Sequence, residues 1–238
     1  MASAAPTIVD LELFLSLDVS GSVDVNEFTL QQQGYVQAFQ DAAVQAAIVS
    51  KPNGVAVALG QWSTTANTPI LGWSLLKTAA DANAFATAIA GISRQSNGST
   101  CVACGINAAV SALQSNDYNG PSVIDVSGDG ENNVGSATST ATARTAAANL
   151  GIKINGLPII TSDFPNLDVW YQANVQTADG FTQPASSFAS FNTAVQKKIV
   201  REITGDTAVP GPLPILGAGM ALGFSRRLRK RINIATLA

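Results

Sequence analysis

The chain contains no histidine, only two cysteines and few charged residues, and each shortage excludes a class of site. Without histidine, neither a Ser-His-Asp nor a Cys-His catalytic arrangement can be built, and metals held by imidazole are excluded. Two thiols alone cannot supply the four ligands that zinc usually takes. The glycine-rich P-loop and the Gly-x-Ser-x-Gly elbow of hydrolases are also missing, so the sequence argues against several large enzyme classes.

The remaining composition is that of a folded domain with a large apolar core. Hydrophobic residues make up 46% of the chain and charged residues 12%, which is typical of a well-buried α/β protein and not of a disordered one. All sixteen acidic residues and eight of the thirteen basic ones lie in residues 1–209, so this part carries a formal charge of −8. Because phosphate binding needs a basic face, an acidic body argues against a nucleic-acid partner.

Apolar, β-rich runs alternate along the chain with longer helical stretches. Strands separated by helices of ten or more residues indicate a parallel sheet that is covered on both faces. We therefore predict an α/β fold with a doubly wound, mostly parallel sheet and helices on both faces. The predicted strands are 11–17, 55–62, 122–126 and 152–160, and the predicted helices are about 24–48, 79–92, 101–115, 136–150 and 186–204.

Three oxygen-rich segments adjoin the ends of predicted strands or the start of a helix. They carry, in chain order, Asp18, Ser20, Ser22, Thr100 and Asp129. Taken alone, the string Asp-x-Ser-x-Ser is more often a helix cap or a turn. Because ligands bind beyond the carboxyl ends of parallel strands, however, we expect these side chains to meet in one crevice. Oxygen-only ligation with few charges suits Mg²⁺, with Mn²⁺ or Ca²⁺ as alternatives.

In this order the five residues resemble the metal-ion-dependent adhesion site (MIDAS) of von Willebrand factor A-type (vWA) domains, written Asp-x-Ser-x-Ser, then Thr, then Asp. The resemblance covers roughly residues 8–204 and extends to an uncharacterised bacterial subfamily through residues 23–28, 127–133 and 188–203. It implies a binding or adhesion module and not an enzyme, in which the bound ion keeps one position open for an acidic group. One departure, Ala103 where a Gly is expected, concerns local helix packing more than the metal.

Other carboxylates near these segments have simpler explanations. Asp24 and Glu27 have the spacing of a capping box for the first long helix. Asp125 lies in the middle of a predicted strand, and we expect it to be buried or to lie behind the ligands. An enzyme would need a general base or a basic clamp beside the two metal carboxylates, but Glu131 is the only further carboxylate nearby and the segments contain no Lys or Arg. A metal-dependent hydrolase is therefore the weaker alternative.

Cys101 and Cys104 are spaced as Cys-x-x-Cys at the start of a predicted helix. In an oxidising compartment this pair can close a small disulfide, and two buried thiols are the main alternative. Redox catalysis has little support, because no thioredoxin-like context surrounds the pair. We therefore note the two residues as a possible disulfide.

The end of the chain combines a Pro-rich break, a short apolar run and a basic cluster, which is the order of a membrane stop signal. As a helix the run 213–224 would be about 18 Å long, too short for a stable span. The tail resembles instead the sorting signals called PEP-CTERM, which an exosortase processes in bacteria, although Gly211 replaces the name-giving Glu. A surface segment or a last helix packed on the domain is the alternative. The residues of the signal are Val209, Pro210, Pro212, Arg226, Arg227, Arg229, Lys230 and Arg231.

These patterns divide the chain into five predicted parts. They are 1–7, left after removal of a signal peptide; 8–204, the vWA-like domain; 205–212, a linker; 213–231, the sorting signal; and 232–238, a tail. The first residues lack the charged and apolar parts of a signal peptide, and Ala2-Ser3-Ala4 looks like the end of a removed one. We predict export to the cell envelope, cell surface or extracellular space, with transient membrane contact through the tail.

The predicted function is thus an exported, metal-dependent binding or adhesion module of the bacterial cell surface or extracellular matrix. Its partner would be an acidic group on a protein or polysaccharide, or a second copy of the chain, besides an exosortase-type processing enzyme. The alternative is a structural protein of the matrix or envelope in which the metal is only a stabilising clip.

Overall fold

The computed structural model describes residues 5–205, and at their centre lies a five-stranded sheet with the strand order β4-β3-β2-β6-β7. The strands are β2 (Leu11–Asp18), β3 (Val55–Trp62), β4 (Ala66–Leu76), β6 (Ser122–Gly128) and β7 (Lys153–Pro158). All pair in parallel except β4, which is antiparallel to β3 at one edge. A separate small sheet pairs β1 (Thr7–Ile8) with β5 (Tyr118–Asn119).

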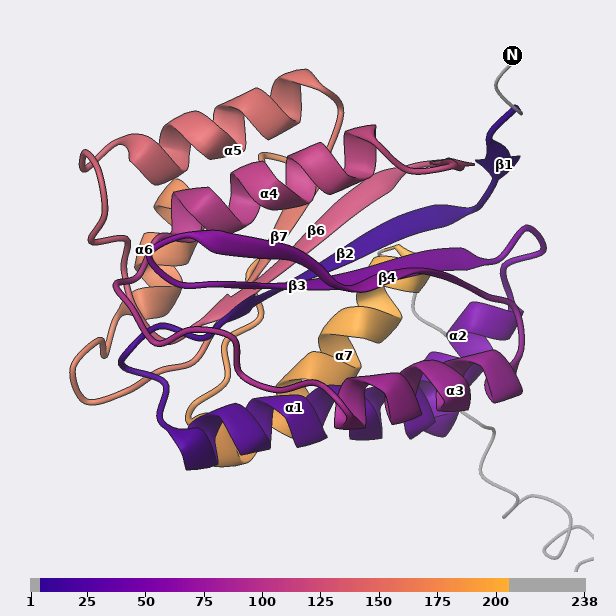
Figure 1. Cartoon of the computed structure of the whole chain (residues 1–238), viewed down its shortest axis with the longest axis horizontal. Helices are drawn as coiled ribbons and strands as arrows, with labels where there is room; N and C mark the ends of the chain where they lie inside the picture. The colour runs from indigo at the N-terminus through magenta and orange to yellow at the C-terminus, as the bar shows by residue number, and fades with distance from the viewer. Residues whose placement is uncertain (1–4, 206–238) are drawn as a thin grey trace, which may run out of the picture. The chain divides into compact units, whose positions relative to one another are not determined.

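Helices cover both faces of this sheet (Figure 1). On one face lie α1 (Val25–Gln40), α2 (Ala42–Val49), α3 (Ala79–Ala90) and α7 (Phe191–Thr204), the last preceded by the 3₁₀ turn η1 (Phe188–Ser190). On the other lie α4 (Val102–Gln114), α5 (Ser139–Asn149) and α6 (Leu167–Asn174). The predicted doubly wound α/β fold is confirmed.

Strand β2 lies in the middle of the sheet, and this position explains its apolar sequence. Every residue of β2 is buried. Leu13 and Leu15 belong to the core on the side of α1 and α7, whereas Phe14 packs with the residues of α4 on the other side. A strand that is covered on both faces needs a nearly continuous apolar run, which is the pattern that predicted it.

The helix predicted over about 24–48 is in fact two helices, because Asp41 ends one and begins the next. The backbone of Asp41 is extended, with ψ at 136°, and its side chain accepts hydrogen bonds from the N–H groups of Ala43 and Val44. Aspartate is among the residues that favour such an N-cap. At the start of α1, the capping box of Asp24 and Glu27 is confirmed.

Strand β4 and helix α6 are absent from the predicted elements. The sequence of β4 contains Pro69 and Gly72, which interrupt an apolar alternation, and proline is tolerated here because β4 lies at the edge of the sheet. Helix α6 has only eight residues and no side-chain cap at its start, so its sequence carries little helix signal.

The strand order reverses beside β2. The chain leaves β2 toward β3 on one side and reaches β6 on the other side only after α4. In doubly wound sheets the crevice at such a reversal, outside the carboxyl ends of the strands, is where ligands bind. Here those ends are Asp18 of β2 and Gly128 of β6.

Several predictions concern residues outside the described range 5–205. They are part of the N-terminal segment predicted over residues 1–7, of which residues 1–4 lie outside the range, and the sorting signal, with its linker and tail, beyond residue 205. Within the described range, no helix is both long and apolar enough to cross a membrane. N-terminal processing, exosortase recognition and membrane contact stay predictions.

Candidate metal centre

The five predicted ligands lie together at the carboxyl end of the sheet. Asp18 closes β2, Ser20 and Ser22 lie in the turn before α1, Thr100 directly precedes the N-cap of α4, and Asp129 follows β6. Ser22 Oγ donates a hydrogen bond of 2.7 Å to Asp129 Oδ1. The hydroxyl oxygens of Ser20 and Ser22 are 3.2 Å apart, and the Thr100 hydroxyl donates to that of Ser20 at 3.3 Å. The fold thus joins all three segments in one connected group of oxygens.

The carboxylate of Asp18 is wholly buried and only half satisfied. Its Oδ1 accepts a hydrogen bond of 2.7 Å from the backbone N–H of Ser20, whereas Oδ2 has no hydrogen-bond partner among the described residues. Burial, together with repulsion from Asp129, raises the pKa of Asp18 to about 7. A buried carboxylate oxygen without a partner is costly, and a cation beside it would remove that cost.

Asp129 contributes the second carboxylate. Burial raises its pKa, the hydrogen bond from Ser22 opposes this rise, and the negative charges of Glu27 and Asp163 add to it. A divalent cation would favour the ionised form of both carboxylates. Within the described residues no three His, Cys, Asp or Glu form a metal cluster, because the other three oxygens of this site belong to hydroxyl groups. Two carboxylates with three hydroxyls form a hard oxygen set, which fits Mg²⁺ or Mn²⁺.

Ser22 marks the open side of the site. Its side chain is exposed, while the other four candidate ligands are buried. A group from another molecule could therefore approach from the side of Ser22 and of the turn that carries it.

The turn after β2 is held by two side chains that the sequence did not single out. Gln31 of α1 is buried and donates to the carbonyl oxygen of Asp18 at 3.3 Å. Arg94 donates to the carbonyl oxygens of Val19 and Ser20, at 3.1 and 2.6 Å. Three consecutive carbonyl groups are thus satisfied without using the hydroxyl groups of the site. No sequence signal marked Arg94, since it lies in an irregular segment 74 residues from Ser20.

Thr100 is fixed in a similar way by the loop that follows β6. Its N–H donates to Asn133 Oδ1 at 2.9 Å, and the N–H of Asn133 donates back to the carbonyl oxygen of Thr100 at 2.9 Å. The next residue, Cys101, donates its N–H to the carbonyl oxygen of Ser63 after β3. These bonds hold the Thr100 hydroxyl against the segment that carries Asp129.

Asp125 lies on β6, within the sheet and before Asp129 in the chain. It is wholly buried, as its position in mid-strand predicted. Its carboxylate forms an ion pair of 2.7 Å with the ammonium group of Lys198 on α7. Glu131 is exposed in the loop after β6. The structure therefore gives Asp125 a charge partner of its own, away from the candidate ligands.

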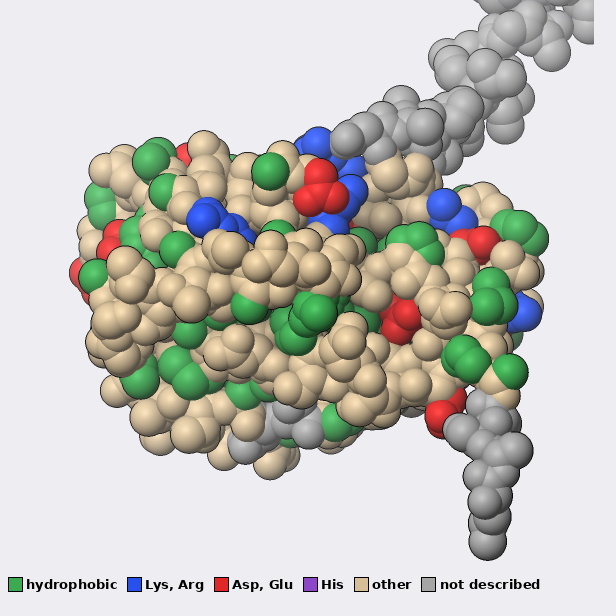
Figure 2. Space-filling model, turned by 90° about the horizontal axis from the view of Figure 1, so that it is seen from above, with side chains coloured by type: hydrophobic (Ala, Val, Ile, Leu, Met, Phe, Trp, Pro, Cys, Tyr) green, Lys and Arg blue, Asp and Glu red, His purple; other side chains and the backbone are tan. Residues whose placement is uncertain are grey.

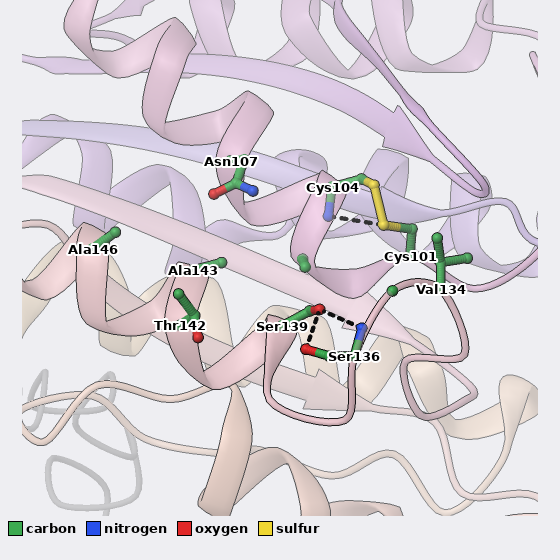
Figure 3. Close-up of a pocket in the computed structure, with 11 residues that line it drawn as sticks. Cys101, Cys104, Asn107, Val134, Ser136, Ser139, Thr142, Ala143 and Ala146 are labelled. Atoms are coloured by element: carbon green, nitrogen blue, oxygen red, sulfur yellow. Dashed lines mark hydrogen bonds between the residues drawn. A yellow bond between two sulfur atoms is a disulfide. The ribbon is translucent and has the colours of Figure 1, made fainter.

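Cys101 and Cys104 form a disulfide at the start of α4 (Figure 3). Cys101 is also the N-cap of α4, because its sulfur accepts a hydrogen bond of 3.2 Å from the N–H of Cys104. The disulfide lines a surface pocket of about 480 Å³ between α4 and α5, where Ser136 and Ser139 hydrogen-bond to each other. The pocket lining is uncharged and contains none of the five candidate ligands, so this pocket is distinct from the metal centre.

The surface over α4 and α5 carries few charged side chains (Figure 2). The sequence of α4 contains no charged residue, and that of α5 contains only Arg144, which donates to the carbonyl oxygen of Ala173. The acidic groups that influence the metal centre lie elsewhere, at the start of α1 and after β7.

Comparison with known proteins agrees with this architecture. A family model described as "Protein of unknown function (DUF1194)" matches residues 8–207. No curated protein matches the chain. Among solved structures, proximal thread matrix protein 1 from the mussel byssus is 16% identical with a TM-score of 0.58, over 83% of this chain and 47% of that protein. In another structure of the mussel protein, the MIDAS motif is occupied by zinc.

Two bacterial structures are similar to the same extent. The pilus adhesin SpaC from Lactobacillus rhamnosus GG is 15% identical with a TM-score of 0.61, over 82% of this chain and 31% of the adhesin. A von Willebrand factor type A protein from Catenulispora acidiphila is 12% identical with a TM-score of 0.56, over 84% of this chain and 43% of that one. The chain thus spans less than half the length of each of these proteins. At these identities the similarity shows the vWA fold.

Proposed function

We propose that this chain, which belongs to the DUF1194 family, is a metal-dependent binding module that works outside the cell. The observation that carries this proposal is the Asp18 carboxylate, which is buried at the carboxyl end of the sheet with one oxygen lacking a partner in the described part of the chain. A carboxylate that is buried beside hydroxyl groups and a second carboxylate can bind a cation, which would compensate the buried charge.

The ion would be held by Asp18, Ser20, Ser22, Thr100 and Asp129, directly or through water. Mg²⁺ is the ion that we favour, and Mn²⁺ or Ca²⁺ could be held by the same oxygens. Once bound, the ion supplies an electrophilic position, because two carboxylates and three neutral hydroxyls shield its charge less than a cage of acidic groups would. The protein's own residues fix the turn and keep its exposed side open at Ser22.

The partner in this proposal offers an acidic group, carried by a protein, by a polysaccharide or by a second copy of the chain. The fold supports a binding role, since the similar structures include a pilus adhesin and a thread matrix protein. The disulfide between Cys101 and Cys104 supports an oxidising location, because such bonds persist outside the reducing cytosol. Delivery by a PEP-CTERM-like signal within residues 209–231 completes the proposal.

A structural role is the second candidate. The candidate ligands already hydrogen-bond to one another and join the segments after β2, before α4 and after β6. An ion in their midst would tighten these contacts and raise stability, whether or not any partner binds. This version agrees with the similarity to a thread matrix protein.

A surface-binding measurement separates the two candidates. The full chain is passed over carboxymethylated dextran, over plain dextran and over immobilised copies of itself, first with Mn²⁺ and then with a chelator. We expect metal-dependent retention on the carboxylated surface or on the chain itself, and no retention on plain dextran. Asp18→Asn removes a ligand charge, and the matched control Asp163→Asn removes an exposed charge that influences Asp129 from outside the site.

The adhesion proposal requires that Asp18→Asn loses retention while Asp163→Asn keeps it. If Mn²⁺ raises the melting temperature of the wild-type chain but retention is the same with and without metal, the structural role is the better description. A chelator that unfolds the chain would contradict an adhesion site that loads and unloads on a folded domain.

A further inference from the structure

The structure places a second buried oxygen without a partner close to Asp18. It is the hydroxyl of Tyr171 on α6, whose side chain is wholly buried and whose oxygen finds no hydrogen-bond partner within residues 5–205. Asp18 Oδ2 is also buried and also lacks a hydrogen-bond partner among these residues. Folded proteins leave few buried polar atoms unsatisfied, so two of them in one place need an explanation.

Gly128 shows that the two oxygens face one small space. A Cβ atom built on Gly128 would lie 2.7 Å from Asp18 Oδ2 and 2.8 Å from the Tyr171 hydroxyl oxygen. Both distances are too short for a carbon contact, so the space stays open only because residue 128 has no side chain. Asp129, the second carboxylate of the metal centre, is the next residue in the chain.

The sheet makes room for the whole ring of Tyr171. A Cβ atom on Gly156 of β7 would lie 2.7 Å from the Cδ1 atom of this ring. Glycines on the neighbouring strands β6 and β7 therefore let the ring lie close to the sheet, with its hydroxyl toward Asp18. Glycine inside a strand often marks a close approach of this kind.

Packing alone does not explain a tyrosine at position 171. A phenylalanine would fill the same space between α6 and the two glycines, without the cost of a buried hydroxyl that lacks a partner. The hydroxyl is therefore expected to act in a state in which it does find a partner.

We propose that Tyr171 is a positioning residue of the metal centre, whose hydroxyl donates a hydrogen bond to the Asp18 carboxylate in the metal-loaded protein; this inference rests on the proposed function. Oδ1 of Asp18 is already held by the N–H of Ser20. A donor on the side of Oδ2 fixes the plane of the carboxylate, and the two lone pairs of that oxygen let it face a cation as well. Groups that orient metal ligands in this way contribute strongly to metal affinity.

Tyr35 offers a matched control for the test. It is wholly buried too, but it packs in the core on the other face of the sheet, and its hydroxyl already donates to Ser127 Oγ at 3.3 Å. Tyr171→Phe and Tyr35→Phe therefore remove the same atom from two buried rings, one without a partner and one with a partner. Mn²⁺ is titrated calorimetrically into the full chain and both variants, and each is melted in the presence of a chelator.

We expect Tyr171→Phe to bind Mn²⁺ roughly tenfold more weakly than the wild-type chain, which is the usual effect of losing a group that orients a ligand. Its melting temperature in chelator should be unchanged or higher, since the lost hydroxyl had no partner there. Tyr35→Phe should show the opposite pattern, with unchanged Mn²⁺ affinity and a lower melting temperature.

If the wild-type chain binds Mn²⁺ and Tyr171→Phe binds it equally well, this inference is overturned and the proposed function is not affected. No Mn²⁺ binding by the wild-type chain would overturn the proposed function, and this inference with it. If Tyr171→Phe loses both affinity and stability, a second measurement is needed to tell a positioning role from a purely structural one. Mn²⁺ is then added to the wild-type chain and to Tyr35→Phe, and the tyrosine difference absorption is recorded. A signal in both supports the role of Tyr171, and no signal in either overturns it.

Discussion

The ammonium group of Lys198 lies 2.7 Å from the carboxylate of Asp125, and both side chains are wholly buried. Lys198 also contacts Glu202, one turn further along α7, at 2.5 Å. Asn155 of β7 donates to the same Glu202 carboxylate at 3.0 Å. The group ties α7 to β6 and β7, and β6 is the strand that leads into Asp129.

Replacing Lys198 should therefore destabilise the domain strongly. Lys198→Met leaves two buried carboxylates without their cation, and loss of one member of a buried ion pair typically costs about 3–5 kcal/mol. We expect the free energy of unfolding, measured by urea denaturation, to fall by about that amount. The neighbouring Lys197 is exposed, so Lys197→Met should change it by less than about 0.5 kcal/mol. Equal stabilities of the two variants would show that the buried pair does not stabilise the fold.

The affinity for metal should depend on pH through Asp18. Burial and repulsion from Asp129 raise the pKa of Asp18 to about 7, so below that pH the ion has to displace a proton. Affinity for Mn²⁺ should therefore rise by up to roughly tenfold per pH unit until about pH 7 and then level off. Calorimetric titrations between about pH 5.5 and 8 check this, and a flat profile would mean that Asp18 is ionised without the ion.

The raised pKa of Asp18 also has a consequence for the metal-free protein, with the sign fixed by proton linkage. The folded state holds the Asp18 proton more tightly than the unfolded state, so protonation of Asp18 stabilises the fold. This contribution to the free energy of unfolding is complete below pH 3.8 and is lost as the pH rises through about 7. Glu202, whose pKa burial also raises to about 7, acts in the same direction. In chelator, the melting temperature should be lower at about pH 8 than at about pH 6, and the difference should be smaller in Asp18→Asn.

Gly128, the last residue of β6, and Gly130, in the loop that follows, should respond differently to alanine. In Gly128→Ala the new methyl group would meet Asp18 Oδ2 at 2.7 Å, whereas in Gly130→Ala its nearest neighbour would be Phe164 at an ordinary 3.5 Å. We expect Gly128→Ala to displace the Asp18 carboxylate and to weaken Mn²⁺ binding by more than roughly tenfold. Gly130→Ala should bind Mn²⁺ nearly as well as the wild-type chain, and similar losses in both would argue against a site that depends on the space at Gly128.

The disulfide should matter for stability more than for metal binding. Closing so short a loop between Cys101 and Cys104 contributes about 2 kcal/mol in the chain-entropy model. Thr100, however, is held by two hydrogen bonds with Asn133, one to its side-chain Oδ1 and one from its backbone N–H. Cys104→Ala should therefore lower the free energy of unfolding by about 2 kcal/mol in urea and change Mn²⁺ affinity little. A large loss of affinity would show that the disulfide, and not Asn133, positions Thr100.

The parallel strands, and the meeting of the five candidate ligands at one end of the sheet, could be predicted because their signals are local. A buried strand shows as an apolar run, and short oxygen-bearing residues at strand ends follow directly in the sequence. Where the prediction was wrong, as for the single helix over 24–48, the error came from one residue, Asp41, whose capping role interrupts an otherwise continuous helical pattern.

The surroundings of the candidate site could not be predicted in this way. Arg94 comes from an irregular segment and Tyr171 from a short helix. The polarity of the residues next to them in the sequence does not indicate a site. Arg94 is placed by contacts with a turn 74 residues away, and Tyr171 by space that two glycines leave on neighbouring strands. Only the packed structure brings such residues together, because each depends on segments that are distant in the chain.

Calorimetric titration of Mn²⁺ into the full chain, into Asp18→Asn and into Asp163→Asn would show whether the protein binds a metal ion through Asp18. Asp18 is the wholly buried carboxylate whose Oδ2 lacks a partner among the described residues, and Asp163 is an exposed carboxylate that influences Asp129 from outside the site. We expect one saturable site in the wild-type chain and in Asp163→Asn, and none in Asp18→Asn. Absence of binding in the wild-type chain, or equal binding in all three, would contradict a metal centre built on Asp18.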